Sequence, residues 1–320
     1  MTPAFVARWD LDKTYLRTDF ETLGDLVRTA FEPPEQKRTV PGARTLLTEI
    51  GHAGAEVHIL SGSPRQMKGK IVAKLSLDGV RFDSLTLKPN LANILRLRFR
   101  ALRDQLGYKL PSLLRSRASG GDRVSPEILL GDDAEADAFV YSLYADLCAG
   151  RVGLDLLREV MRRGGAYPDT ITDAVALARG MQKRDVVRRI LIHLDRQTRP
   201  SRFSPLGRRV VPFYNYLQAA CVLVEEELLP AESVIRVAEE FVRAHRFDGL
   251  ALSRSYLELA RRGFARGSLP KRLAGLSSGE VAVREMIARL AEADVPPPST
   301  KLDDLPDYLE LAQRHNPRAH

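Results

Sequence analysis

Cysteine and histidine are scarce in this sequence, and neither is spaced as a metal or redox site requires. The 320 residues include two cysteines, Cys148 and Cys221, far apart in the chain. That spacing argues against a disulfide framework and against a cysteine-based metal centre, so we expect two reduced, buried thiols. The six histidines likewise lack the spacing of a zinc site. Disulfide-stabilised secreted scaffolds and zinc-binding folds are therefore disfavoured.

Long apolar runs are also missing. No segment reaches the roughly 18 consecutive apolar residues that a membrane-spanning helix needs. The opening stretch, MTPAFVARWD, meets a charge too early to contain the apolar core of a secretory signal. Hydrophobic residues make up 44% of the chain and charged residues 28%, which is enough to bury a core and stay in solution. We therefore expect a cytoplasmic protein of one large domain or two ordinary ones.

Positive charge is in excess, and this favours anionic partners. The formal net charge is +8, which suits nucleic acid, an acidic membrane surface or phosphorylated small molecules. However, the basic residues are scattered among acidic ones, and aromatic residues do not alternate with them as in proteins that stack single-stranded bases. We expect a phosphorylated substrate and peripheral contact with an anionic membrane, with nucleic acid the less favoured partner.

The first half of the chain alternates strand-like and helix-like patterns. Four apolar runs predict strands: AFVARWD, AEVHILSGSP, FDSLTLKPN and PEILLGDD. Helical patterns lie between them, at residues 43–54, 92–107 and 109–118. Strands and helices that alternate with connections of several residues predict an α/β fold with a doubly wound parallel sheet. We assign this domain to residues 1–150.

The second half carries mainly helical spacing. Apolar residues recur three and four positions apart in GLDLLREVMRR, ITDAVALARGM, DVVRRILIHLDRQ, NYLQAACVLVEEELL, ESVIRVAEEFVRAH and SYLELARRGFA. The segment 198–213, rich in Pro, Arg and Ser, predicts a loop between two sets of helices. We see no strand pattern here and expect residues 151–320 to form an all-α domain of unknown role.

Polar side chains follow three of the predicted strands at the point where each strand ends. Asp10 and Asp12 follow the first, Ser61 and Ser63 the second, and Asp132 the fourth. The carboxyl ends of parallel strands meet at one edge of the sheet, where ligands bind. Two like charges two residues apart are unfavourable unless a cation or a shared proton relieves them. The sequence therefore predicts a site at this edge.

The residue types at this edge suit phosphoryl transfer. A carboxylate can attack phosphorus and form an aspartyl-phosphate, and a second can exchange a proton with the leaving group and with water. Carboxylates from two strand ends would repel each other unless a hard cation such as Mg²⁺ joined them. A serine hydroxyl, backbone N–H groups and a lysine such as Lys109 would cover the phosphoryl oxygens.

The order of these residues resembles the haloacid dehalogenase superfamily of phosphatases, and most closely the catalytic domain of actin-patch-associated phosphatidate phosphatases. The similarity covers about residues 5–150 and is carried by DLDKTYLRT, VPGARTLL, HILSGSPRQM, FDSLTLK, GYKLPSLL and ILLGDDAEADAFVYSLYADL. It implies a haloacid dehalogenase-type sheet and a Mg²⁺-dependent phosphatase. A lipid phosphate such as phosphatidate is the implied substrate class.

The resemblance also implies a role for each matching residue. Asp10 would be the nucleophile and Asp12 the general acid and base. Ser61 and Lys109 would hold the phosphoryl group. The Mg²⁺ ion would be bound by Asp10, Asp132 and the backbone carbonyl of Asp12.

Several alternatives remain at this stage. Gly62 and Ser63 are expected to bind substrate beside Ser61, although Ser61 also suits a helix cap. Asp133 and Asp137 suit metal binding and helix capping equally. Three other lysines compete with Lys109: Lys68, Lys70 and Lys88. A phosphatase acting on nucleic-acid ends and a weakly active binding module that presents its helical half to a partner are the alternative functions.

Overall fold

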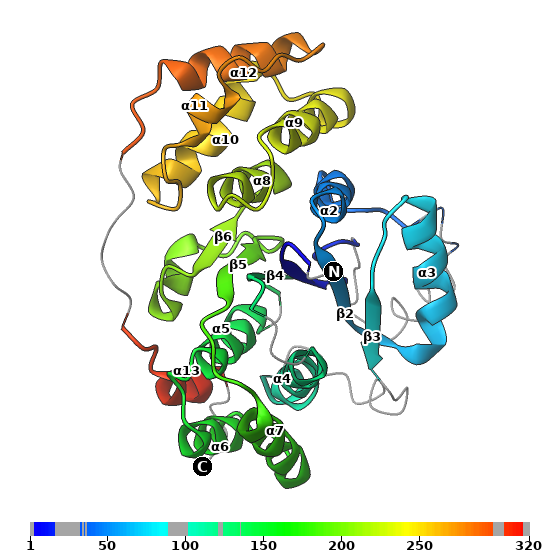
Figure 1. The fold of residues 1–320 in the computed structure, drawn as a ribbon, viewed down its shortest axis with the longest axis vertical. Coiled ribbons are helices and arrows are strands. Elements are labelled where there is room, and N and C mark those ends of the chain that lie inside the picture. Colours follow the sequence, from blue (N-terminus) through cyan, green and yellow to red (C-terminus); the bar gives the residue numbers. More distant parts are fainter. Residues whose placement is uncertain are drawn as a thin grey trace.

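A six-stranded parallel sheet forms the centre of the molecule (Figure 1). The computed structural model describes residues 3–16, 33, 35, 37–88, 102–120, 124–134, 136–296 and 304–315. The strands run in the order β3-β2-β1-β4-β5-β6, and every neighbouring pair is parallel. They are β1 Val6–Asp10, β2 Glu56–Pro64, β3 Ser84–Lys88, β4 Glu127–Asp132, β5 Val187–His193 and β6 Val210–Phe213. The predicted α/β class with a parallel sheet is confirmed.

Helices cover both faces of this sheet, and this explains the continuous apolar runs in its central strands. Every residue of β1 and β4 is buried, as expected for strands packed on both faces. Successive side chains of a strand point to opposite faces. Trp9 and Leu130 accordingly belong to one hydrophobic core, while Leu129 belongs to the other.

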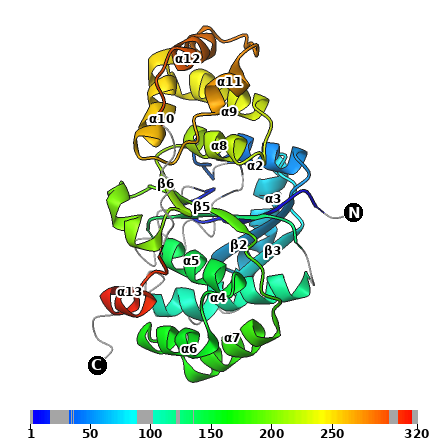
Figure 2. The same ribbon diagram turned by 60° about the vertical axis from the view of Figure 1, so that its left-hand side comes forward.

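Seven of the described helices contribute buried residues to the first core and five to the second. The first set comprises α2 Ala43–His52, α3 Lys68–Leu77, α8 Tyr216–Glu225, α9 Glu232–His245, α10 Gly249–Arg261, α11 Leu269–Leu273 and α12 Val281–Ala291. The second comprises α4 Leu102–Ser119, α5 Asp137–Cys148, α6 Leu154–Arg163, α7 Pro168–Gly180 and α13 Tyr308–His315. Helices α10, α11 and α12 of the first set stack beyond α8 and away from the sheet (Figures 1 and 2). Two short 3₁₀ helices, η2 Arg65–Met67 and η4 Pro200–Leu206, complete the described elements.

The prediction that residues after 150 contain no strand is wrong. β5 and β6 belong to the second half of the chain and extend the sheet beyond β4. The segment expected to be helical around Val187 is a strand, and the expected loop 198–213 contains η4 and β6. An all-α domain over residues 151–320 is therefore not confirmed, because the sheet continues across residue 150.

The reason for the error is visible in β5. Val187, Ile190, Leu191 and Leu194 have the three-and-four spacing of an amphipathic helix. A short apolar run of this kind cannot be assigned to helix or strand by periodicity alone. The structure buries all four, and the first three belong to a strand that lies between β4 and β6, while Leu194 directly follows it. The other helices expected in this half are present as α6 to α10.

The predicted break between two helices near residue 108 is also wrong. One helix, α4, runs from Leu102 through Pro111 to Ser119. The earlier part of the expected helix, residues 92–101, lies outside the described residues. In the described part of the chain no helix is both long enough and apolar enough to span a membrane.

The direction in which successive strands are added to the sheet reverses at its middle, between β1 and β4. The chain leaves β1 for β2 and β3 on one side, and then returns to form β4, β5 and β6 on the other. β1 and β4 are therefore neighbours whose connections lead in opposite directions. In open α/β sheets ligands bind outside the carboxyl ends of such a strand pair. Asp10 ends β1 and Asp132 ends β4, so both flank this point.

Candidate active site

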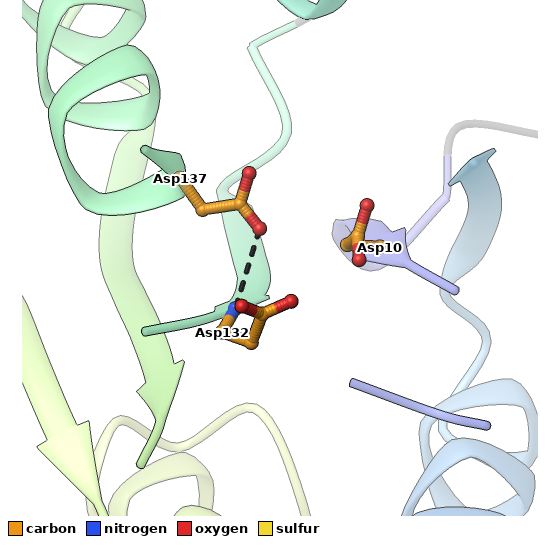
Figure 3. Close-up of side chains that lie close together, drawn as sticks. All are labelled: Asp10, Asp132 and Asp137. Atoms are coloured by element: carbon orange, nitrogen blue, oxygen red, sulfur yellow. Dashed lines mark hydrogen bonds between the residues drawn. The ribbon is translucent and has the colours of Figure 1, made fainter. Parts of the chain in front are cut away.

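Three buried aspartates meet at the carboxyl edge of β1 and β4 (Figure 3). One carboxylate oxygen from each of Asp10, Asp132 and Asp137 lies within 4.8 Å of the other two. Asp10 and Asp132 were predicted to converge here, and they do, because the parallel register of β1 and β4 aligns their ends. We call these three residues the aspartate cluster.

Asp137 completes the cluster from the first residue of α5. Its Oδ2 accepts a hydrogen bond from the backbone N–H of Asp132 at 3.2 Å. A Cβ at Gly131 would lie 2.4 Å from that Oδ2, so the carboxylate fits because residue 131 has no side chain. Sequence reasoning left Asp137 undecided, although the glycine before Asp132 was the signal that a side chain packs there.

Lys109 supplies a positive charge to the cluster from α4. Its side chain is completely buried, and its Nζ lies 2.8 Å from Asp10 Oδ1 and also contacts Asp137 Oδ1. The structure thus places Lys109 where the sequence predicted it, beside Asp10. Three carboxylates and one ammonium group have a formal charge of −2 when all are ionised.

Asp12 points to two serines, Ser61 and Ser63, near the carboxyl end of β2. Its Oδ2 accepts hydrogen bonds from Ser61 Oγ at 2.7 Å and from Ser63 Oγ at 3.2 Å. The Ser61 hydroxyl also accepts the backbone N–H of Ser63 at 3.0 Å. The alternative that Ser61 caps a helix is wrong, since the residue before η2 is Pro64.

The Asp12 carboxylate is thus held by hydroxyl donors and is not one of the three that form the aspartate cluster. A metal role for this residue through its backbone carbonyl stays a prediction. Gly62, between the two serines, is half-buried, and a Cβ there would meet open space. The expected role of Gly62 and Ser63 in binding the substrate also remains a prediction.

An unusual backbone conformation and two hydrogen bonds define the turn after β1. Lys13 has a left-handed backbone with φ of 59°, a conformation that costs a non-glycine residue roughly 1 kcal/mol or more. Thr14 Oγ1 donates to Asp10 Oδ2 at 3.3 Å, and the N–H of Leu11 donates to the carbonyl of Leu60 at 2.9 Å. These bonds hold Asp10 and Asp12 in one orientation relative to the sheet.

Tyr216, at the start of α8, supports the same turn. Its hydroxyl donates to the backbone carbonyl of Thr14. Its ring stacks on Trp9 with centroids 5.8 Å apart and planes 7° from parallel. Burial and the nearby carboxylates Asp132 and Asp10 raise the Tyr216 pKa well above its ordinary value, so the phenol stays a hydrogen-bond donor. Tyr216 lies 202 positions after Thr14 in the sequence, so no local pattern indicates that the two residues are in contact.

Asp133 has a different role from its neighbour. Its carboxylate accepts the backbone N–H groups of Arg196 at 2.8 Å and of Thr198 at 3.0 Å. Its own N–H donates to the carbonyl of His193 at 3.0 Å. Asp133 therefore joins the loop after β4 to the loop after β5, and the metal-binding alternative for this residue is not supported.

The donor set at the aspartate cluster fits a hard divalent cation. Carboxylate oxygens from two strand ends and one helix start are the ligands that Mg²⁺ and Ca²⁺ prefer. One such ion would bring the formal charge of the three carboxylates and the Lys109 ammonium group to zero. The three oxygens do not select Mg²⁺ over other hard cations.

No protein-family model matches the chain, and no curated protein matches it in sequence. The geometry of the site therefore carries the functional argument.

Proposed function

We propose that this protein is a Mg²⁺-dependent phosphatase that hydrolyses a phosphomonoester through an aspartyl-phosphate. The observation that carries this proposal is the position of Asp10. It is buried at the switch point of the sheet, 2.8 Å from Lys109 and within 4.8 Å of the carboxylates of Asp132 and Asp137. Haloacid dehalogenase membership, which the order of the motifs implies, is part of the proposal.

In the first step the Asp10 carboxylate attacks phosphorus. The new bond joins an Asp10 oxygen to phosphorus, and the bond from phosphorus to the ester oxygen breaks. Asp12 gives its proton to the departing alkoxide, so the alcohol leaves neutral. The hydroxyl of Ser61 and the ammonium group of Lys109 stabilise the charge on the phosphoryl oxygens.

In the second step water releases the phosphate. Asp12 takes a proton from water as the water oxygen attacks phosphorus, and the bond from phosphorus to Asp10 breaks. This restores the Asp10 carboxylate and the protonated form of Asp12 with which the first step began. Asp10 and Asp132 would hold Mg²⁺, with Asp137 beside them. When bound, the ion supplies positive charge that offsets the repulsion between the carboxylates and the phosphate. Burial of the aspartates keeps bulk water from screening these interactions.

The substitution Asp10→Asn tests the nucleophile. It should abolish Mg²⁺-dependent release of p-nitrophenol from p-nitrophenyl phosphate. Asp155→Asn, an exposed carboxylate in α6, is the matched control and should retain full activity. Wild-type activity in the Asp10→Asn protein would disprove the assignment.

A trapping experiment tests the intermediate. With p-nitrophenyl phosphate, whose leaving group is a weak base that needs no proton from Asp12, the Asp12→Asn protein should still form the aspartyl-phosphate. It should hydrolyse this intermediate slowly, because no base activates the water. Acid quenching followed by mass spectrometry should then find one added phosphoryl group on the peptide that contains Asp10. A phosphoryl group on another residue, or none during turnover, would contradict the two-step route.

We further propose a lipid phosphate such as phosphatidate as the substrate, on the similarity of the motif set. Hydrolysis of phosphatidate in mixed micelles should exceed hydrolysis of soluble sugar phosphates. Efficient turnover of soluble phosphates with none of phosphatidate would overturn this part and leave the phosphatase proposal intact.

A further inference from the structure

A cavity of about 550 Å³ lies on the same edge of the sheet as the aspartate cluster. Its walls come from the loop after β4, the loop after β5, η4 and α13. Asp133 and Ala136 line it, and they directly follow Asp132 and precede Asp137 in the chain. The stretch from Asp132 to Asp137 therefore contributes residues both to the aspartate cluster and to this cavity.

The cavity combines positive charge with apolar surface. Three exposed arginines line it: Arg196, Arg202 and Arg314. Among the described residues of the lining, the acidic side chain is that of Asp133, which already accepts two backbone N–H groups at 2.8 and 3.0 Å. Guanidinium groups are the cations best suited to bind phosphate and carboxylate in two parallel hydrogen bonds.

Apolar side chains form the rest of the wall. Phe139 and Leu311 are buried at its base, and Phe203 is half-buried beside them. A volume of several hundred Å³ with an apolar lining and a few charged groups is typical of a site for a small organic ligand. The lining therefore fits a molecule that has both an anionic group and an apolar part.

Helix α13 packs beside α6 (Figure 2), is joined to α5 through Tyr308, and contributes Leu311 and Arg314 to the cavity wall. Its Tyr308 hydroxyl donates to Asp146 Oδ2 at 2.6 Å, and its ring meets Phe139 edge-on with centroids 5.6 Å apart. Arg314 lies six residues after Tyr308 in α13 and lines the cavity. The contacts of Tyr308 with α5 therefore help to fix the position of Arg314. Its ion pair with Glu310 is exposed and therefore weak.

We propose that this cavity binds a second anionic group of the substrate, together with the adjoining apolar part. The substrate would then be a lipid-like phosphate ester that carries a second anionic group, which phosphatidate itself lacks. Its phosphomonoester would bind at Asp10 and the second group at Arg202 and Arg314. This inference rests on the proposed phosphatase function, because it requires a phosphate at the aspartate cluster.

Calorimetric titration with phosphonates that cannot be hydrolysed tests the proposal. The probes are α,ω-alkane bisphosphonates with bridges from hexane to dodecane, each compared with the alkyl monophosphonate of the same length, in Mg²⁺ buffer. For one bridge length the bisphosphonate should bind wild type about tenfold more tightly than its partner. The double variant Arg202→Gln/Arg314→Gln should lose that advantage.

The control is Arg254→Gln, an exposed arginine of α10 that is not part of the cavity lining, and it should keep the full advantage. Arg202 and Arg314 are both exposed, so their replacement should leave the fold intact. An advantage below about threefold for every bridge length, or one that persists in the double variant, would overturn the inference.

Turnover separates this inference from the function on which it rests. Hydrolysis of p-nitrophenyl phosphate by wild type without any bisphosphonate advantage would refute the cavity alone. Absence of that hydrolysis would refute the phosphatase proposal.

Discussion

The carboxylate of Asp137 occupies the space that a side chain at Gly131 would fill. A Cβ on Gly131 would lie 2.4 to 2.8 Å from the Oδ2, Cγ and Cβ atoms of Asp137. Distances below 3.0 Å require something to move, and here the atoms concerned belong to a residue of the aspartate cluster. The glycine is thus needed for close approach and not for an unusual backbone angle.

We predict that Gly131→Ala displaces Asp137 and lowers Mg²⁺-dependent phosphatase activity by on the order of a hundredfold, because small shifts of reacting groups have large effects. Overpacking should also reduce the free energy of unfolding by about 1–3 kcal/mol. Steady-state kinetics and urea unfolding measure the two effects. Gly69→Ala in α3, where a Cβ meets open space, should affect neither activity nor folding adversely. Full activity in Gly131→Ala would show that the position of Asp137 is unimportant.

We predict that Lys109→Met destabilises the metal-free protein by about 3–5 kcal/mol, since it leaves buried Asp10 and Asp137 without their cation. Added Mg²⁺ should recover part of the loss by supplying positive charge at the same place. Urea unfolding with and without Mg²⁺ measures both quantities. Lys68→Met, at an exposed position, should change little. A metal-free Lys109→Met protein as stable as wild type would contradict this account.

A buried ion-pair cluster at the opposite edge of the sheet predicts a pH dependence. Glu127 accepts hydrogen bonds from Arg8 Nε at 2.7 Å, Arg117 Nη1 at 3.1 Å and the Tyr144 hydroxyl at 2.8 Å. Burial opposes ionisation of Glu127, but the two guanidinium groups outweigh it and lower its pKa. A lowered pKa stabilises the fold above the unfolded value of about 4.3, and that contribution is lost as pH falls through the folded pKa.

Glu127→Gln should therefore cost about 3–5 kcal/mol near neutral pH, because it leaves two buried guanidinium groups without a counter-ion. The difference from wild type should shrink as the pH falls well below about 4. Denaturant titrations at several pH values measure this. Glu159→Gln, whose exposed pair with Arg162 is screened by water, should have a much smaller effect. A difference that does not change with pH would show that Glu127 ionisation is not involved.

We predict that Tyr216→Phe lowers kcat while KM stays close to wild type. The variant keeps the ring stack on Trp9 but removes the hydroxyl that holds the carbonyl of Thr14, so the turn that carries Asp10 loosens. The free energy of unfolding should fall by about 1 kcal/mol. Tyr256→Phe, which removes a buried hydrogen bond to Glu225, should destabilise similarly without lowering kcat. Equal kcat values in the two variants would assign Tyr216 a purely structural role.

The sequence predicted the part of the site that depends on strand ends. Asp10 and Asp132 each follow a continuous apolar run, and parallel strands bring such ends to one edge. Lys109, one of four candidate lysines, does lie beside Asp10, but it is within α4 and not at the start of a helix as predicted. Asp137 was not resolved, because a carboxylate at the start of a helix has the same pattern whether it caps the helix or faces a ligand.

The rest of the fold depended on contacts that local patterns do not contain. In β5 the spacing of Val187, Ile190 and Leu191 fits a helix, and pairing with β4 makes it a strand. In β6, Pro212 argues against a central strand, and the structure places it in the edge strand, where proline is tolerated. The stacking of Tyr216 on Trp9 joins residues 207 positions apart and leaves no local signal.

The position of β5 beside β4 has a practical consequence for dissecting this protein. A fragment that stopped at residue 150 would leave one whole side of β4 with exposed N–H and C=O groups, and sheet edges of that kind recruit other chains. It would also uncover Trp9, since α8 would be gone. Such a truncated protein is expected to aggregate. The aspartate cluster and the elements after residue 150 should therefore be kept together in any fragment or chimaera of this protein.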